Sequence, residues 1–205
     1  MQQPTATKDH WETVYTEKGP QEVGWTQTSP EPSFTLIKAS GIPKDAPIID
    51  VGGGDSLLVD YLLEAGYTDL TVLDISGKAL ERARERLGPE KAGHVQWIEQ
   101  DVRFFEPGRT YALWHDRATF HFLTEEADRA RYQELVKRFT TQSLVIGTFS
   151  TDGPARCSGL PVVQYDAATL AKAFAPEFGA IHTQQSMHYT PAGKPQAYIF
   201  AHFTK

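Results

Sequence analysis

The sequence predicts an α/β fold in which helices cover both faces of a mainly parallel β-sheet. Three observations lead to this prediction. Short apolar runs alternate with segments of helical spacing across residues 47–149, and such alternation implies crossover connections between parallel strands. Three consecutive glycines, residues 52–54, separate the first run from the helix after it. Near the C-terminus only residues 191–195 join two extended stretches, which suits a hairpin and is too short for a crossover.

Length and composition set the class of protein. The 205 residues suit one domain with a short extension. Hydrophobic residues make up 40% and charged residues 22%, which is ordinary for a globular protein and excludes wholesale disorder. With 26 acidic and 20 basic residues, the net charge is -6. This balance argues against a protein that binds the phosphate backbone of nucleic acids, which usually carries a basic patch.

Targeting and metal-binding signals are also missing from the sequence. No apolar run is long enough to span a bilayer. Residues 1–13 are polar and lack the apolar core of a secretion signal. The one cysteine, Cys157, excludes an internal disulfide bond and a metal site built from several cysteines. We therefore expect a cytoplasmic protein that binds no metal, no membrane and no nucleic acid.

Cap and turn residues set the expected bounds of the helices. Ser76, Thr124 and Asp166 each precede a segment of helical spacing and are good N-caps. Glycine after the last apolar residue, as at Gly66, is typical of a helix end, and Gly88 with Pro89 should end another helix. The expected helices cover residues 8–17, 34–40, 57–64, 78–87, 125–139 and 167–174.

The apolar runs between these helices are expected to be strands. They cover residues 47–51, 70–73, 95–98, 111–114, 143–149, 182–189 and 197–203. Because the last connection is a hairpin, the last strand should run antiparallel to the rest. Residues 1–33, which we call the N-terminal arm, lie outside the alternating pattern and carry Trp11, Tyr15 and Trp25. Residues 34–205 should form the Rossmann-like domain.

The glycine loop and two acids form the first candidate site. Glycines between a strand and a helix let the backbone approach a ligand, and the helix N-terminus offers free N–H groups. Alone, such a loop could be a simple tight turn. However, Asp74 and Asp101 end the next two strands, and ligands of parallel α/β sheets bind outside those ends. A carboxylate at Asp74 can accept both hydroxyls of a ribose. Asp101 can accept from an adenine amine while the N–H of Val102 meets a ring nitrogen.

Together these motifs resemble those of class I S-adenosylmethionine-dependent methyltransferases. Residues 48–58 resemble the glycine-rich first motif of the family, residues 73–76 its ribose motif, residues 100–102 its adenine motif and residues 114–123 the segment after its fourth strand. Ser56 stands where the family has its third glycine. The resemblance implies a doubly wound, seven-stranded sheet of order 3-2-1-4-5-7-6 and S-adenosylmethionine as the cofactor.

The resemblance also implies which residues meet the cofactor. The matching positions are Asp50, Gly52, Gly54, Asp74, Asp101, Val102 and His115. We add as expected cofactor contacts their neighbours Gly53, Ser56 and Ile75 and the arm residues Tyr15 and Trp25. An aromatic arm could be a lid that excludes water and stabilises the sulfonium. It could equally be a strap that only covers a sheet edge.

The acceptor should approach beyond the fourth and fifth strands, where His115, Asp116 and Arg117 follow one another. The cofactor brings an activated methyl group, so the protein mainly supplies position and desolvation. His115 or Asp116 could act as a base, and Arg117 could hold an anionic acceptor. Alternatively, Asp116 and Arg117 could form a structural ion pair, and His121 could be a satisfied core histidine.

A long polar loop, residues 149–161, follows the fifth strand, and loops of this length are more often functional than decorative. Arg156 and Cys157 in it could face the acceptor. Cys157 is a poor candidate nucleophile, because methyl transfer needs no covalent enzyme intermediate, and it could simply be a small packed residue.

For the acceptor we favour a small soft nucleophile such as a thiol or a related chalcogen compound. The chain has no inserted recognition domain, and an aromatic arm with one loop would enclose a small pocket. The alternative is protein-lysine N-methylation, with Asp116 organising the amine. Two other classes stay open: a nicotinamide-dependent oxidoreductase using the same loop and Asp74, and a non-catalytic protein that binds the cofactor.

Overall fold

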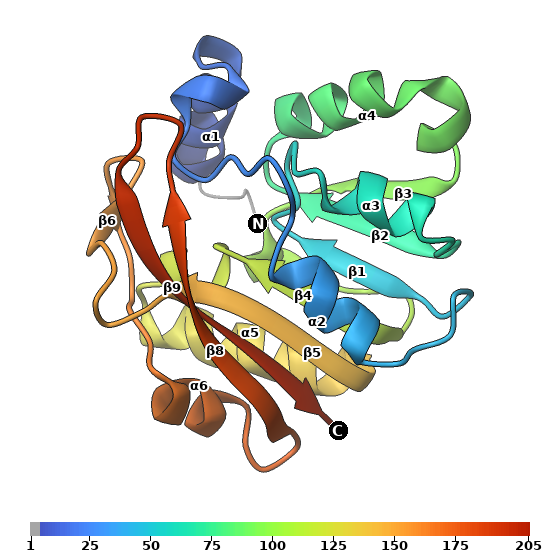
Figure 1. Cartoon of the computed structure of the whole chain (residues 1–205), viewed down its shortest axis with the longest axis vertical. Coiled ribbons are helices and arrows are strands. Elements are labelled where there is room, and N and C mark those ends of the chain that lie inside the picture. The colour runs from blue at the N-terminus through green and yellow to red at the C-terminus, as the bar shows by residue number, and fades with distance from the viewer. Residues whose placement is uncertain (1–4) are drawn as a thin grey trace.

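Seven strands form one sheet in the computed structural model, which describes residues 5–205 (Figure 1). Their order is β3-β2-β1-β4-β5-β9-β8. The strands are β1 (Ile48–Val51), β2 (Leu70–Asp74), β3 (Val95–Glu99), β4 (Tyr111–Arg117), β5 (Thr140–Phe149), β8 (Gly179–Tyr189) and β9 (Pro195–Thr204). The first five pair in parallel, whereas β9 runs antiparallel to both β5 and β8. The predicted order and the antiparallel last strand are therefore confirmed.

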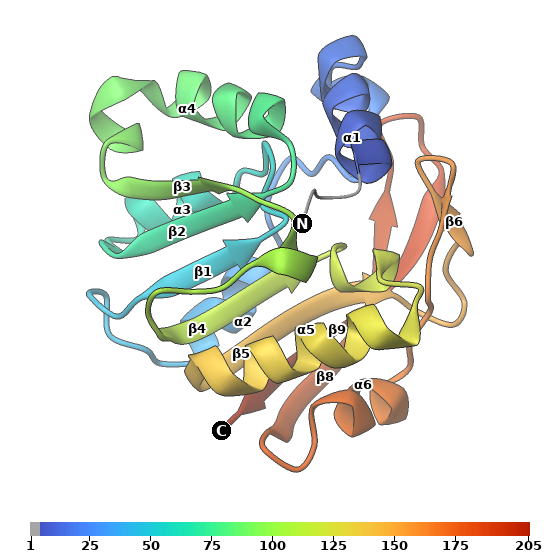
Figure 2. The same ribbon diagram turned by 180° about the vertical axis from the view of Figure 1, so that it is seen from behind.

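Helices cover both faces of this sheet. The helices are α1 (Thr5–Glu17), α2 (Ser33–Ala39), α3 (Leu58–Glu64), α4 (Gly77–Ala92), α5 (Glu126–Phe139) and α6 (Ala167–Phe174), with short 3-10 turns η1 (Pro20–Glu22), η2 (Val102–Phe104) and η3 (Phe120–Phe122). One buried apolar cluster contains residues of α2, α3 and α4, and the other contains residues of α5 and α6. Figures 1 and 2 show α5 and α6 on the face away from α2 and α3. No helix among residues 5–205 has the length and apolar character of a membrane span.

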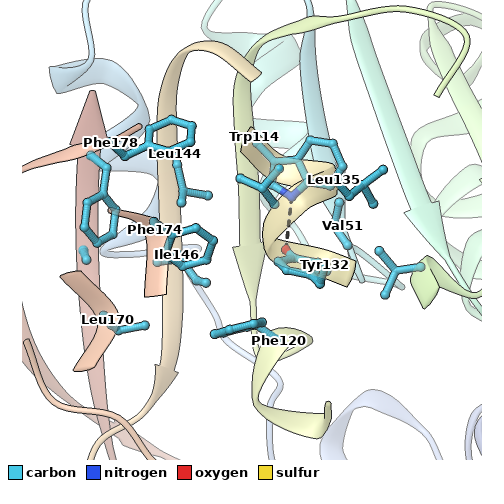
Figure 3. Packing of buried hydrophobic residues seen from close by; sticks show 14 of the residues in the cluster. Val51, Trp114, Phe120, Tyr132, Leu135, Leu144, Ile146, Leu170, Phe174 and Phe178 are labelled. Carbon is cyan, nitrogen blue, oxygen red and sulfur yellow. Dashed lines mark hydrogen bonds between the residues drawn. The ribbon is translucent and has the colours of Figure 1, made fainter. Parts of the chain in front are cut away.

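The core beneath α5 is built around a buried polar contact. The indole Nε1 of Trp114 donates to the hydroxyl of Tyr132 over 3.1 Å (Figure 3). That hydroxyl in turn donates to Oδ2 of Asp116 over 2.5 Å. All three side chains are buried, so each polar atom needs a partner inside the protein.

Two of the three predicted helix caps are confirmed. Ser76 and Asp166 each accept a hydrogen bond from the backbone N–H three residues ahead. Thr124 was the wrong residue for the third, because α5 begins after Glu125, which makes no side-chain cap bond. Gly88 breaks α4 at φ 74°, and Pro89 then starts a further helical turn up to Ala92, which Pro favours through its fixed φ.

The long loop after β5 contains a small hairpin that the sequence pattern did not predict. Its strands, β6 (Arg156–Cys157) and β7 (Leu160–Pro161), are two residues each and pair antiparallel. The turn consists of Ser158 at φ 49° and Gly159 at φ 79°. Positive φ at both central residues is the usual hairpin turn. The hairpin places Cys157 and Leu160 on the wall of the cavity described next.

Candidate functional site

A cavity of about 660 Å³ lies where β1, β2, β3 and β4 end, covered by the N-terminal arm and the β6–β7 hairpin. Its wall holds nearly all of the residues that the sequence analysis proposed. They are Tyr15, Trp25, Asp50, Gly52, Gly53, Ser56, Asp74, Ile75, Asp101, Val102, His115 and Arg117. Gly54 and Asp116 are not part of this wall, and the reasons differ.

The glycine loop cannot carry side chains without disturbing the cavity. Gly52 has φ +66°, and a Cβ there would lie 1.7 Å from Oγ1 of Thr119. Gly54 has φ +51°, and its Cβ would lie 2.7 Å from the hydroxyl of Tyr15. Gly54 is thus covered by the arm residue Tyr15. Both positions need glycine for the backbone angle and for the space.

Arg86 of α4, which was not predicted from the sequence, binds the end of this loop and also lines the cavity. Its Nη1 and Nη2 each donate over 2.7 Å, to the carbonyl oxygens of Asp55 and Ser56. Its Nε and Nη2 also bind the two carboxylate oxygens of Asp60. No local pattern in the sequence indicates these contacts, because they join residues 26 to 31 positions apart.

Asp74 sits at the end of β2, buried beneath the arm, with 7% of its surface exposed. Its Oδ1 accepts from the N–H of Ser76 over 2.8 Å. Burial raises the pKa of Asp74 to about 7, and the nearby charges of Asp55 and Asp50 add to this. The carboxylate faces the cavity beside Tyr15, where a ribose could donate both of its hydroxyls.

Asp101 is buried and already carries a strong partner. Arg103 donates from Nε to Oδ1 over 3.0 Å and from Nη2 to Oδ2 over 2.5 Å, and its backbone N–H also binds Oδ1. The sequence analysis did not foresee this pair. Nε also lies 3.0 Å from Oδ2. A carboxylate has about four lone-pair positions, so an exocyclic amine would share Oδ2 with Arg103.

His115 is fixed on both sides. Its Nδ1 lies 2.7 Å from Oδ1 of Asp50, and its Nε2 lies 2.8 Å from Oγ of Ser33 in α2. All three residues are buried. His115 lines the cavity. Because both of its ring nitrogens have protein partners, it has no free nitrogen to take a proton from an acceptor.

Asp116 points to the opposite face of β4, and the geometry argues against the predicted role as a base. Its carboxylate accepts from the hydroxyl of Tyr132 and from the backbone N–H groups of Thr119 and Phe120. The side chain has no exposed surface, and burial raises its pKa to about 6. Successive residues of a strand face opposite sides of a sheet, a signal that separates Asp116 from His115 and Arg117 in the sequence itself.

Arg117 forms no ion pair with Asp116, contrary to that alternative. Its Nη1 donates to the carbonyl oxygen of Trp25 over 3.0 Å, and its guanidinium carbon lies 5.0 Å from the centre of the Tyr198 ring. Among residues 5–205, its Nε and Nη2 have no hydrogen-bond partner although both are shielded from water. Arg117 is also part of the wall of a second cavity of about 390 Å³ between the arm and the β8–β9 hairpin.

The aromatic residues of the arm pack into one group over the cavity. The ring centres of Trp11 and Trp25 lie 5.6 Å apart, and Trp11 also meets Phe122 at 5.1 Å. Glu12, which the sequence analysis missed, accepts from the first backbone N–H groups of α4, at Gly77 over 2.7 Å and Lys78 over 3.3 Å. Free N–H groups at a helix start favour a carboxylate, and this contact anchors α1 beside Asp74.

The remaining candidates divide between the core and the cavity wall. His121 is fully buried, its Nδ1 accepts from the N–H of Phe149 over 3.3 Å, and burial lowers its pKa to about 3. Cys157 faces the cavity, and burial raises the pKa of its thiol to about 11. Arg156 is exposed and donates to the carbonyl of Gly159 in its own turn, so it does not face this cavity.

Comparison with known proteins agrees with this arrangement. A family model described as a methyltransferase domain matches residues 48–141. This range holds the glycine loop and the acids that end β2 and β3. The chain therefore contains a methyltransferase domain over these residues. Solved methyltransferases of the same fold hold S-adenosylmethionine or S-adenosylhomocysteine.

Curated relatives of this chain are named as lysine methyltransferases, and their identity to it is low. One is the eEF1A lysine and N-terminal methyltransferase of Mus musculus, 29% identical over 122 residues, which are 58% of this chain and 17% of the relative. Another is EEF1A lysine methyltransferase 2 of Mus musculus, 22% identical over 135 residues, which are 60% of this chain and 54% of the relative. This chain thus spans less than a fifth of the first relative and about half of the second.

Solved structures share the fold over almost the whole chain. One is a structure reported under the description "Conversion of a Disulfide Bond into a Thioacetal Group during Echinomycin Biosynthesis". Its TM-score is 0.77 at 17% identity, and the match covers 97% of this chain and 92% of that one. Magnesium protoporphyrin IX methyltransferase from Synechocystis PCC 6803, with bound S-adenosylhomocysteine, has a TM-score of 0.68 at 17% identity and covers 98% and 94%. At such identities the likeness shows the fold alone, and it does not select an acceptor.

Proposed function

We propose that this methyltransferase acts on a small soft nucleophile, such as a thiol or a related chalcogen compound. The carrying observation is that neither of the two candidate bases at the end of β4, His115 and Asp116, is placed to take a proton from the acceptor. Both nitrogens of His115 are engaged, and Asp116 faces the other side of the sheet. A thiol can lose its proton to water near neutral pH, whereas a lysine ammonium needs help to do so.

The wall of this end is largely apolar. It includes Trp11, Trp25, Phe122, Cys157, Leu160 and Pro161, together with the charged side chain of Arg117. Such a wall excludes water and suits a small, polarisable acceptor more than a hydrated one. Cys157 is protonated at neutral pH because of its raised pKa, so it packs against the acceptor and does not compete for the methyl group.

The cofactor site supports the same proposal. When bound, S-adenosylmethionine supplies a methyl group activated on a sulfonium. Asp74 would accept the ribose hydroxyls, and Asp101 with the N–H of Val102 would meet the adenine. Tyr15 and Trp25 would place aromatic rings beside the sulfonium, where a cation gains from the face of a π-system. The loop from Gly52 to Gly54 would let the methionine end approach the backbone.

The second candidate is protein-lysine methylation. The two curated relatives named above support it, because both are named as eEF1A lysine methyltransferases. The site lends it less support. A lysine acceptor would share the cavity end with the positively charged Arg117 and would need a base that Asp116, with its oxygens held by Tyr132 and backbone N–H groups, does not supply.

Turnover with methyl-labelled cofactor separates the two candidates. The purified protein is offered a panel of small thiols and selenols and, separately, an elongation-factor preparation. We expect label in the small-molecule fraction, with release of S-adenosylhomocysteine that depends on the thiol. Label in the protein fraction alone, surviving acid hydrolysis as methyl-lysine, would replace this proposal by the second candidate.

A further inference from the structure

We propose that the acceptor carries an anionic group, such as a carboxylate, and that Arg117 holds it; this deepens and rests on the proposed function. Arg117 has two donors, Nε and Nη2, that are shielded from water and have no partner among residues 5–205. A buried donor without a partner is costly, and a buried charged donor more so. Such an arrangement therefore calls for a ligand that completes it.

The edge of the guanidinium that is left open has a specific chemistry. Nε and Nη2 carry parallel N–H bonds and bind two oxygens of one carboxylate side by side. Two other arginines of this chain use that same edge in this way. Arg86 binds Asp60 through Nε and Nη2, and Arg103 binds Asp101 likewise. In Arg117 the third nitrogen, Nη1, is fixed on the Trp25 carbonyl, which leaves the Nε and Nη2 edge for a ligand.

Two further donors lie on the same side of the sheet. The Tyr198 ring lies under the Arg117 guanidinium, and its buried hydroxyl has no partner within the described part of the chain. His121, whose pKa is lowered by burial and by the charge of Arg117, is neutral. Because its Nδ1 accepts from Phe149, its proton sits on Nε2, which is also buried and unpaired within residues 5–205. We call Arg117, His121 and Tyr198 the donor cluster.

The position of the donor cluster indicates that it binds the acceptor, because it lies away from the acids that are expected to bind the adenosine. Arg117 ends β4 and contacts Tyr198 of β9, whereas Asp74 and Asp101 end β2 and β3 on the other side of β1. Arg117 also lines the second cavity, which contains neither of those acids. Glu31 is the acidic residue on that second wall, and its carboxylate accepts from the N–H of Thr35. The Trp25 carbonyl that holds Nη1 belongs to the arm, and Arg117 also lines the first cavity, where the acceptor is expected.

The proposed acceptor is therefore a small thiol or selenol with a carboxylate a few bonds away. Its proton goes to water, and the resulting thiolate sulfur bonds to the methyl carbon while the bond from that carbon to the sulfonium breaks. The electron pair of the broken bond leaves with S-adenosylhomocysteine. Arg117 contributes by orienting the carboxylate, so that the sulfur lies in line with the methyl group.

A matched pair of thiols tests this proposal. 3-Mercaptopropionate and 3-mercaptopropanamide have the same shape and differ in charge. We expect kcat/KM for the carboxylate to exceed that for the amide by roughly ten-fold to a hundred-fold, the range of a charged hydrogen bond. In Arg117→Gln this ratio should fall to about one, and Arg117→Lys should lie between. The control Arg156→Gln changes an exposed arginine of the neighbouring hairpin and should keep the wild-type ratio.

Three results would overturn the anion site. One is a wild-type ratio near one, which would leave thiol methylation standing. Another is an unchanged ratio in a folded Arg117→Gln variant. The third is that Arg117→Gln loses as much affinity for S-adenosylhomocysteine as it loses turnover. In that case the Nε and Nη2 edge of Arg117 would hold the carboxylate of the cofactor. If neither thiol is methylated, the proposed function fails on its own. Calorimetry with the protein loaded with S-adenosylhomocysteine then decides the anion site: a carboxylate preference lost in Arg117→Gln supports it, and no preference overturns it.

Discussion

The carboxylate of Asp50 lies 2.7 Å from Nδ1 of His115, and this contact joins the end of β1 to the end of β4. The aspartate of the glycine-rich motif therefore orients an imidazole that lines the cavity beside it. Ser33 completes the arrangement at Nε2. The three residues connect α2 to β1 and β4. His115 therefore has a structural role in the wall of the candidate cofactor site.

This arrangement predicts what Ser33→Ala does. The substitution leaves a buried ring nitrogen without its partner, which should lower the free energy of unfolding by about 1–3 kcal/mol. Denaturant unfolding measures that loss. Turnover per folded molecule and its pH profile should stay close to wild type. A new acidic limb in the pH profile would show instead that His115 handles a proton during the reaction.

Asp74 predicts how cofactor affinity depends on pH. Its pKa is about 7 in the free protein, and the ionised form accepts the ribose hydroxyls. The affinity for S-adenosylhomocysteine should therefore rise roughly ten-fold between pH 6 and pH 8, with release of a proton on binding. Calorimetry in buffers of different ionisation enthalpy measures both. Asp74→Asn should flatten this dependence, whereas Asp116→Asn, which changes a carboxyl outside the cavity, should keep it.

The same pKa has a consequence for stability without cofactor. The native pKa of Asp74 lies above the value near 4 expected in the unfolded chain. Between these values the native state binds more protons than the unfolded state, so the contribution of this group to stability falls as the pH rises from about 4 to 7. In Asp74→Asn the free energy of unfolding should depend less on pH between about 4 and 7 than it does in the wild type, and denaturant unfolding at several pH values measures this. An unchanged slope would mean that Asp74 is ionised throughout.

Two glycines with positive φ allow the cost of backbone strain to be measured apart from the cost of filling the space beside the glycine loop. A Cβ at Gly52 (φ +66°) would strike Thr119, whereas a Cβ at Gly66 (φ +86°) would meet open space. Both alanine variants should lose about 1–2 kcal/mol of stability from the backbone angle. Gly52→Ala alone should also lose cofactor binding, which equilibrium dialysis with S-adenosylhomocysteine measures. Equal affinities in the two variants would mean that the glycine loop does not contact the cofactor.

The sequence predicted the parts of the site that depend on local order. Asp74 and Asp101 each end an apolar run, and parallel strands bring their carboxyl ends to one edge. What it could not predict are contacts between distant elements. Ser33 meets His115 across 82 positions and Glu12 meets Gly77 across 65, and no periodicity indicates such pairs. The side of the sheet that Asp116 faces could have been predicted from the alternation along β4, because successive residues of a strand face opposite sides.

The arm carries the last prediction. Trp25 is partly buried, packs against Trp11 and Tyr15, and lines the cavity. Trp25→Ala should therefore reduce turnover more than it reduces the melting temperature. The matched control is Trp97→Ala: Trp97 is also partly buried, but it packs beside α4, where its Nε1 donates to the Ala92 carbonyl. That variant should lose stability and keep its turnover per folded molecule.

Deleting residues 1–26 extends the same prediction. The strands pair without these residues, so the core should stay folded and transfer methyl groups far more slowly. Some stability should be lost, because Val14 and Val23 are buried and Glu12 caps the start of α4. Circular dichroism melting and release of S-adenosylhomocysteine, measured on the same preparations, separate the two effects. If the deletion lowers the melting temperature while turnover per folded molecule stays normal, the arm is a strap that only covers the sheet edge, and the acceptor site then rests on β4 and the β6–β7 hairpin alone.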